Sequence, residues 1–137
     1  MFLLDTNVVS ELRRRDRAAP TLLKWIDNIE PTTLYLSAIS LLELDLGALR
    51  AAHRDKRQGA IFTRWIEDAV LPAFGDRILP IDSAVARICA TLHVPDPRPE
   101  RDALIAATAL VHRLTVATRN VRDFEPLGVA LIDPWNV

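Results

Sequence analysis

Short apolar runs alternate along this chain with longer stretches in which apolar residues recur every three or four positions. A short apolar run bounded by turn residues is typical of a buried strand, whereas the longer spacing is typical of a helix with one buried face. The short runs predict five strands, which cover residues 2–4, 34–36, 78–81, 114–117 and 129–132.

The stretches between these runs predict helices, whose ends are marked by capping residues and prolines. Ser37 or Ser40 can begin a long helix that continues to about Arg57, and the helix after it is expected to pack against it as a hairpin. The other predicted helices cover residues 8–15, 20–30, 60–70, 84–92 and 100–112.

Strands that alternate with helices predict an α/β fold with a mainly parallel sheet covered by helices on both faces. The 137 residues contain no repeat and no low-complexity linker, so residues 1–137 are expected to form a single domain. In such sheets the sites lie beyond the carboxyl ends of the strands. Asp5 follows the first strand there, and Asn120 and Asp123 follow the fourth.

Composition changes this picture little. A net charge of −1 and a pI of about 6.3 do not indicate a strongly basic nucleic-acid-binding protein. The basic residues other than Lys24 and Lys56 are arginines, which match the geometry of phosphate well. A run between Arg13 and Arg17 is either a solvated helix end or a contact for a phosphate backbone.

The cellular location is expected to be the cytoplasm. Cys89 is the only cysteine, so no internal disulfide can form and a reducing compartment is the default. No apolar run approaches the roughly 18 residues that a membrane-spanning helix requires. We therefore expect a protein with no membrane partner.

The candidate chemistry lies in acids that occur in apolar settings. An ionised carboxylate is costly to remove from water, so apolar segments that repeatedly end in an acid suggest a shared divalent cation. Asp5 follows Phe2-Leu3-Leu4 and has an ordinary alternative role as a helix cap. Because Asn7 stands two residues later, the chain lacks the second aspartate of a haloacid-dehalogenase-type phosphatase, and a ligand role suits Asp5 better.

Glu43 lies among leucines in a predicted helix, on the same face as Ser40, Gly47 and Arg50. An isolated glutamate would usually belong to a solvated face. Gly47 argues otherwise, because glycine inside a helix costs about 1 kcal/mol relative to alanine and suggests close approach of another segment.

Asp102 opens an alanine-rich helix that is apolar enough to be largely buried, which brings this acid toward the interior. Acids in a first helical turn also compensate the helix dipole. Asn120 and Asp123 lie in a polar segment after the fourth strand, where both are natural turn residues. The histidines show no metal-ligand spacing, and no glycine-rich phosphate loop or serine nucleophile elbow occurs.

Together these segments resemble a PIN domain, and more narrowly a VapC or FitB-type toxin of a bacterial type II toxin-antitoxin pair. The resemblance covers nearly the whole chain. It rests on Leu3-Leu4-Asp5-Thr6-Asn7, Ser40-Leu41-Leu42-Glu43-Leu44, Asp102-Ala103-Leu104-Ile105-Ala106-Ala107-Thr108-Ala109, Thr118-Arg119-Asn120-Val121-Arg122-Asp123-Phe124 and the closing Asp133-Pro134-Trp135.

The resemblance implies a PIN-like three-layer sandwich and a metal-dependent endoribonuclease that uses Mg²⁺ or Mn²⁺ to hydrolyse RNA. By position, Asp5, Glu43 and Asp102 match the three principal acids of the family. The fourth position of the site, which we call its fourth corner, falls to Asp123 or Asn120. The implied roles place metal on Asp5 and Asp102 and a water-orienting role on Glu43. Contacts to the RNA backbone fall to Arg119, Arg122 or the run from Arg13 to Arg17. The implied partners are a cognate antitoxin and a second copy of the chain.

Two other functions remain open from the sequence. One is a PIN nuclease that works in RNA processing or on DNA, and the other is a catalytically silent protein that only binds an antitoxin. Metal-dependent RNA cleavage, measured with and without chelator, separates an enzyme from a binding protein. Growth arrest on expression, and a neighbouring gene for a DNA-binding antitoxin, would favour the toxin.

Overall fold

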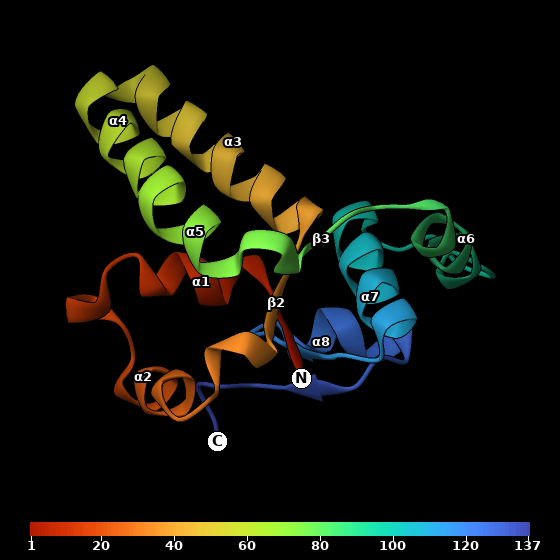
Figure 1. The fold of residues 1–137 in the computed structure, drawn as a ribbon. Helices are drawn as coiled ribbons and strands as arrows, with labels where there is room; N and C mark the ends of the chain where they lie inside the picture. The colour runs from red at the N-terminus through yellow and green to blue at the C-terminus, as the bar shows by residue number, and fades with distance from the viewer.

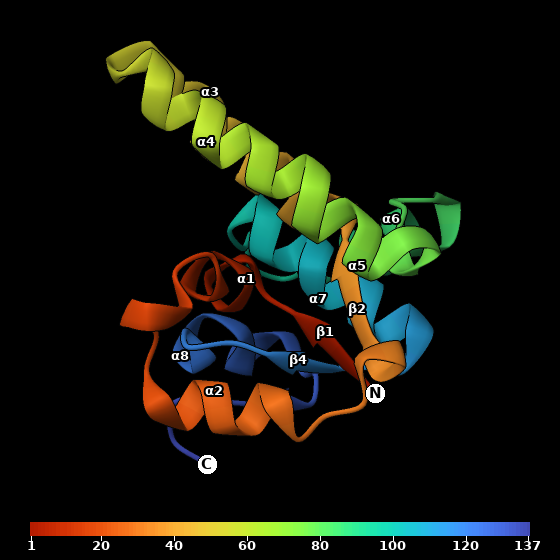
Figure 2. The same ribbon diagram turned by 60° about the vertical axis from the view of Figure 1, so that its left-hand side comes forward.

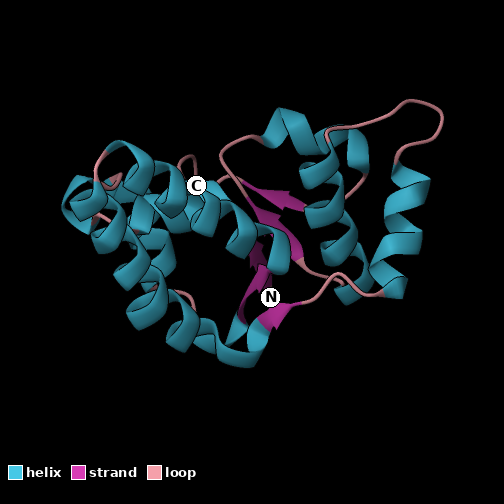
Figure 3. Cartoon of the chain, turned by 90° about the horizontal axis from the view of Figure 1, so that it is seen from above, coloured by secondary structure: helices cyan, strands magenta, loops and turns pink.

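A five-stranded, fully parallel sheet forms the centre of the protein in a computed structural model that describes residues 1–137 (Figures 1 and 3). Its strands stand in the order β3-β2-β1-β4-β5. Their bounds are β1 Phe2–Leu4, β2 Leu34–Ser37, β3 Ile78–Leu79, β4 Thr115–Ala117 and β5 Leu131–Ile132. The predicted strands are therefore confirmed, with β3 and β5 shorter than expected.

Helices follow the strands, as the sequence predicts. Between the longer elements lie short 3-10 turns at Arg15–Arg17, Pro31–Thr33, Gly75–Arg77 and Glu125–Leu127. The α-helices are α1 Thr6–Leu12, α2 Pro20–Asp27, α3 Ala38–Arg54, α4 Lys56–Trp65, α5 Leu71–Phe74, α6 Ser83–Leu92, α7 Glu100–His112 and α8 Val121–Phe124.

The two faces of the sheet carry separate cores, as strand alternation requires. Leu4 packs with Val8, Leu36 and Leu44 on the face covered by α1, α2 and α3. Leu3 instead packs with residues of α7 and α8 on the opposite face. In Figure 3 the sheet lies between these two groups of helices. The predicted three-layer sandwich is confirmed.

The α3–α4 pair forms the expected hairpin, which projects from the sheet on the side of α1 (Figures 1 and 2). Its turn lies earlier than predicted. Asp55 adopts an extended backbone that ends α3, and its side chain accepts from the backbone N–H groups of Arg57 and Gln58 to begin α4. This cap explains why the predicted continuation of α3 to Arg57 is wrong.

Other boundaries are also set by local chemistry. Asp5 caps α1, so this helix begins at Thr6 instead of Val8, and the buried Ser37 caps α3 instead of Ser40. The predicted helix over residues 60–70 is longer at both ends, because a π-helical turn over Ile66–Val70 joins α4 to α5.

Gly47 lies against the ring of Phe62, whose nearest atom would lie 3.4 Å from a Cβ placed there, an ordinary contact distance. The tighter contact in the hairpin is at Gly59, where a Cβ would lie 2.3 Å from that of Ala52. Gly59 is thus the residue that allows α3 and α4 to meet, and the sequence interpretation did not single it out. None of the helices has the length and apolar character needed to cross a membrane.

Candidate active site

The predicted site residues gather at the carboxyl edge of the sheet. Strand β1 lies in the middle, and the chain continues to β2 on one side and reaches β4 on the other. Loops that leave adjacent strands in opposite directions open a crevice at such a switch point. Asp5 directly follows β1 there, and its N–H donates to the carbonyl of Ala117 at the end of β4 (2.9 Å).

Asp5 is the most firmly held of the acids. The side chain is 6% exposed. Its Oδ1 accepts from the Thr6 N–H (2.8 Å), and its Oδ2 accepts from the Thr118 hydroxyl (2.7 Å) and the Asn7 amide (3.3 Å). Burial raises the pKa of Asp5, the Thr118 and Thr6 hydrogen bonds oppose that change, and Glu43 and Asp123 add to it. The carboxylate is thus fixed in place but electrostatically unfavourable.

Glu43 reaches the same crevice from α3. Its Oε1 accepts from the Thr6 hydroxyl (2.7 Å), whose oxygen lies 3.0 Å from that of the fully buried Ser40. Its Oε2 lies 3.7 Å from Arg101, but both side chains are partly exposed, so this ion pair contributes little. The Ser40 and Glu43 part of the predicted helical face therefore does point into the site.

Asp102 enters from the first turn of α7. Burial raises its pKa to about 6, and repulsion from Asp5, Asp123 and Glu43 adds to the effect. Four acids from separate segments of the chain therefore lie near one another in the fold. No nearby cation offsets their combined charge beyond the single distant contact of Arg101.

These side chains surround a cavity of about 380 Å³ that no hydrophobic residue lines. We call it the acidic cavity; its lining residues are Asp5, Thr6, Asn7, Ser10, Glu43, Asp102 and Asn120. Carboxylate, amide and hydroxyl oxygens are the donors that Mg²⁺ and Mn²⁺ prefer. As the side chains stand, no three of the acids are arranged to hold one ion.

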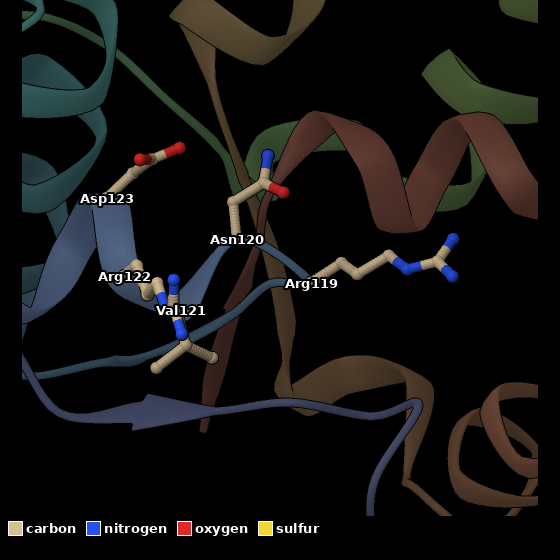
Figure 4. Close-up of a pocket in the computed structure, with 5 residues that line it drawn as sticks. All are labelled: Arg119, Asn120, Val121, Arg122 and Asp123. Carbon is tan, nitrogen blue, oxygen red and sulfur yellow. The ribbon is translucent and has the colours of Figure 1, made fainter.

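The fourth corner is divided between two residues. Asn120 lines the acidic cavity and also a neighbouring cavity of about 430 Å³, whereas Asp123 lines only the second. In Figure 4 their side chains extend to the same side, while Arg119 points away from Asp123. The segment that the sequence presents as a loop is partly helical, because α8 begins at Val121 and places Asp123 in its first turn.

Two threonines that the sequence does not mark as site residues organise this site. Thr118 is fully buried, donates to Asp5 and accepts from the Asn120 N–H (3.0 Å), so it links two corners. Thr6 links Asp5 to Glu43 in the same way. Both lie within two residues of the end of the neighbouring strands β1 and β4, and this shared position is the feature of the sequence that could have indicated their role.

The arginines expected near the RNA lie in different settings. The guanidinium of Arg119 stands 5.2 Å from the ring centre of Trp135, which in turn donates from Nε1 to Glu11 (3.0 Å). Arg15 forms an exposed ion pair with Asp27 (2.7 Å). These contacts tie Arg119 and Arg15 to the protein's own side chains.

Comparison with known proteins decides the family. Residues 2–128 match the PIN domain. The chain belongs to the PIN domain family.

Its relatives match it over nearly their whole length. It is 43% identical to VapC ribonuclease Y4jK of Sinorhizobium fredii, over 98% of each chain, and 38% identical to Toxin FitB of Neisseria gonorrhoeae, over 99% of each. The crystal structure of FitAcB from Neisseria gonorrhoeae matches this PIN domain with a TM-score of 0.90 and 37% identity over all of both chains. The predicted resemblance to VapC and FitB-type toxins is confirmed.

Proposed function

We propose that this PIN domain is a metal-dependent endoribonuclease that acts in the cytoplasm as the toxin of a type II toxin-antitoxin pair. The observation that carries the proposal is the gathering of Asp5, Glu43 and Asp102 around one cavity without hydrophobic lining, at the switch point of the sheet. The relatives named a VapC ribonuclease and a toxin support the reaction and the biological role.

A divalent cation fits the residues present. Asp5 and Asp102 both have raised pKa values because burial and neighbouring acids disfavour their charged forms. A bound cation would reverse that effect, and the donors are hard oxygens suited to Mg²⁺ or Mn²⁺. We assign the binding to Asp5 and Asp102, with Glu43 and either Asp123 or Asn120 completing the set. Such an ion supplies charge neutralisation for a phosphodiester and acidifies water.

Asp5 and Glu43 have different roles in the proposed reaction. Asp5 is held at both oxygens by Thr6, Asn7 and Thr118, so it is preorganised before any ligand arrives. Glu43 has Oε1 held by the Thr6 hydroxyl and is more accessible than Asp5. This position suits Glu43 to orient water and accept its proton during attack on the phosphorus of RNA.

The proposed partners are an antitoxin and a second copy of the chain. Solved relatives include toxin-antitoxin complexes, among them one titled a toxin-antitoxin complex from Klebsiella pneumoniae (25% identity, TM-score 0.71). For the homodimer, Leu42 and Leu49 are 48% and 67% exposed and stand two helical turns apart on α3. Leu49→Lys is expected to shift the mass measured by light scattering from dimer toward monomer.

The function is tested with purified protein, RNA and Mg²⁺ or EDTA. We expect cleavage with Mg²⁺, none with EDTA, and a loss of about 100-fold or more with Asp102→Asn. Asp96→Asn is the matched control, because Asp96 is exposed and lies in the loop before α7. Unchanged Mg²⁺-dependent cleavage by Asp102→Asn would overturn the assignment. Binding of an antitoxin without any cleavage would favour the catalytically silent alternative.

A further inference from the structure

A second polar groove lies between the end of α1 and the α3–α4 hairpin. It has a volume of about 400 Å³ and is lined by four arginines together with Gln58 and Phe62. We call it the arginine groove; its arginines are Arg13, Arg14, Arg50 and Arg54. Figures 1 and 2 show that the hairpin stands beside α1, so the groove joins segments far apart in the sequence.

None of these arginines has a carboxylate partner. The ion pairs of the protein are Arg15 with Asp27 and Arg101 with Glu43, both outside the groove. Asp55 is near in sequence, but its side chain caps α4 through backbone N–H groups. Four positive charges therefore converge in a protein whose net charge is −1.

An aromatic ring orients one arginine of the groove. The guanidinium carbon of Arg13 lies 4.1 Å from the centre of the Phe62 ring, a cation–π contact that orients Arg13. Gly47 lies against the same ring. Burial, and then the charge of Arg14, lower the pKa of Arg13.

An ordinary explanation covers part of this arrangement. Basic residues are favoured at helix C-termini, and Arg13 and Arg54 both lie at such ends. That preference acts on each helix alone. It does not explain why the arginines of two helices face one groove, nor why Arg50, a full turn earlier in α3, also lines it.

The groove and the acidic cavity lie along the same two helices. Arg13 is eight residues beyond Asp5 along α1, and Arg50 is seven beyond Glu43 along α3. At about 1.5 Å per residue these separations are roughly 10–12 Å. A stacked strand advances about 3.4 Å per nucleotide, so the two sites are about three nucleotides apart.

We infer that the arginine groove binds the phosphate backbone of an RNA strand about three nucleotides from the bond that the acidic cavity cleaves. This inference rests on the proposed function. Arginine's fork matches phosphate geometry, and four arginines suit a ligand whose charges repeat. An acidic protein segment would meet the same carboxylates, but it has no phosphodiester for the acidic cavity to act on, so RNA is the ligand that engages both sites.

The test measures binding in EDTA, where no RNA is cleaved. The probe is a fluorescein-labelled oligouridylate of about 12 nucleotides. The groove variant carries Arg14→Gln, Arg50→Gln and Arg54→Gln, and leaves Arg13 with its Phe62 contact intact. The matched control carries Lys24→Gln, Arg64→Gln and Arg87→Gln, which remove three exposed charges outside the groove.

We expect the groove variant to bind at least about tenfold more weakly than the control. The slope of log affinity against log salt should fall by about 2, since each lost phosphate contact removes about 0.7. Lysine at the same three positions should restore most of the slope, because charge alone sets it. Melting curves of both triple variants verify that each is folded.

Equal affinity and slope for groove variant and control would overturn the inference. Binding of poly-glutamate serves as a second probe. If the groove variant loses poly-glutamate binding but keeps oligouridylate binding, the groove is a site for an acidic polypeptide and the inference is overturned. Equal loss of both probes would mark an unselective polyanion site and would also count against it. The proposed function is tested by a different measurement: it fails if the unaltered protein shows no Mg²⁺-dependent cleavage of RNA.

Discussion

The acidic cavity and the arginine groove lie on the same two helices but are built differently. In the acidic cavity each of Asp5 and Glu43 is held by hydroxyl or amide donors at 2.7–3.3 Å. The groove arginines make no hydrogen bond to another side chain, and Arg13 alone is oriented, by an aromatic ring. Fixed carboxylates suit chemistry, which requires positions held to fractions of an ångström, whereas loosely held charges suit affinity.

This difference predicts which kinetic constant each region controls. Changes in the acidic cavity should lower kcat, because its groups act on the reacting atoms. Changes in the arginine groove should raise KM, because its groups hold RNA that is the same before and during reaction.

The largest expected effect is that of Glu43→Gln. The amide keeps the size of the side chain and can still accept from Thr6, but it cannot take a proton from water. We expect kcat to fall about 10²–10⁴-fold with KM changed by less than about threefold. Steady-state cleavage of RNA in Mg²⁺ measures both constants.

Asp45→Asn is the control for this change, since Asp45 is exposed on the same helix and does not line either region. A raised KM with kcat preserved in Glu43→Gln would mean that Glu43 holds RNA, and the contrast between the regions would disappear.

A smaller effect is expected from Thr118→Val, which removes the hydroxyl that donates to Asp5 Oδ2 inside the protein. Losing a buried partner of a carboxylate should lower the free energy of unfolding by about 1–3 kcal/mol. The pKa of Asp5 should rise further, because the Thr118 hydrogen bond lowers it. Urea unfolding and the acid limb of the kcat/KM profile provide the two readouts.

Thr118→Ser keeps the hydroxyl and should restore both stability and the pH profile. If Thr118→Ser behaves like Thr118→Val, the methyl group's packing matters more than the hydrogen bond, and Thr118 is not a positioning residue for Asp5.

The smallest effect concerns stability against pH without metal. The pKa of Asp102 is raised to about 6 from 3.8, so the folded protein binds this proton more tightly than the unfolded chain. The stabilising contribution is therefore complete below about pH 4 and is lost as pH rises to about 6. Because Asp102 is partly exposed, we expect a change of about 1 kcal/mol in EDTA.

Urea unfolding at several pH values measures this loss. Mg²⁺ should remove it by stabilising the ionised carboxylates, and Asp102→Asn should remove it without Mg²⁺, while Asp96→Asn should keep the slope of the unaltered protein. If the free energy of unfolding in EDTA instead rises between about pH 4 and pH 6, Asp102 is not surrounded by uncompensated acids.

Much of the fold was predictable because the signals are local. Apolar runs predicted the five strands, and the helix predicted over residues 84–92 is α6, which is capped by Asp82 accepting from the Val85 N–H. The errors fell at helix ends. Asp55 ended α3 early and the π-helical turn extended α4, because hairpin packing and side-chain caps outweigh a weak preference at a boundary.

The candidate acids were predictable in kind, because a carboxylate in an apolar segment is unusual wherever it falls. Thr118 and Thr6 were not, since a threonine after a strand is ordinary in sequence and acquires a role only when a second strand places an acid beside it. Of the four groove arginines, Arg13 and Arg14 belong to the basic run visible in the sequence, whereas Arg50 and Arg54 join them only through the packing of α3 beside α1.

The sequence alone thus determined the α/β architecture, the PIN resemblance and the identity of the acids, since strand and helix periodicity and the cost of a buried charge act residue by residue. Only the tertiary structure decided which hydroxyls hold those acids, how Asn120 and Asp123 share the fourth corner, and where the arginines converge. These outcomes depend on distances between residues as much as 113 positions apart, which the packing of strands and helices sets.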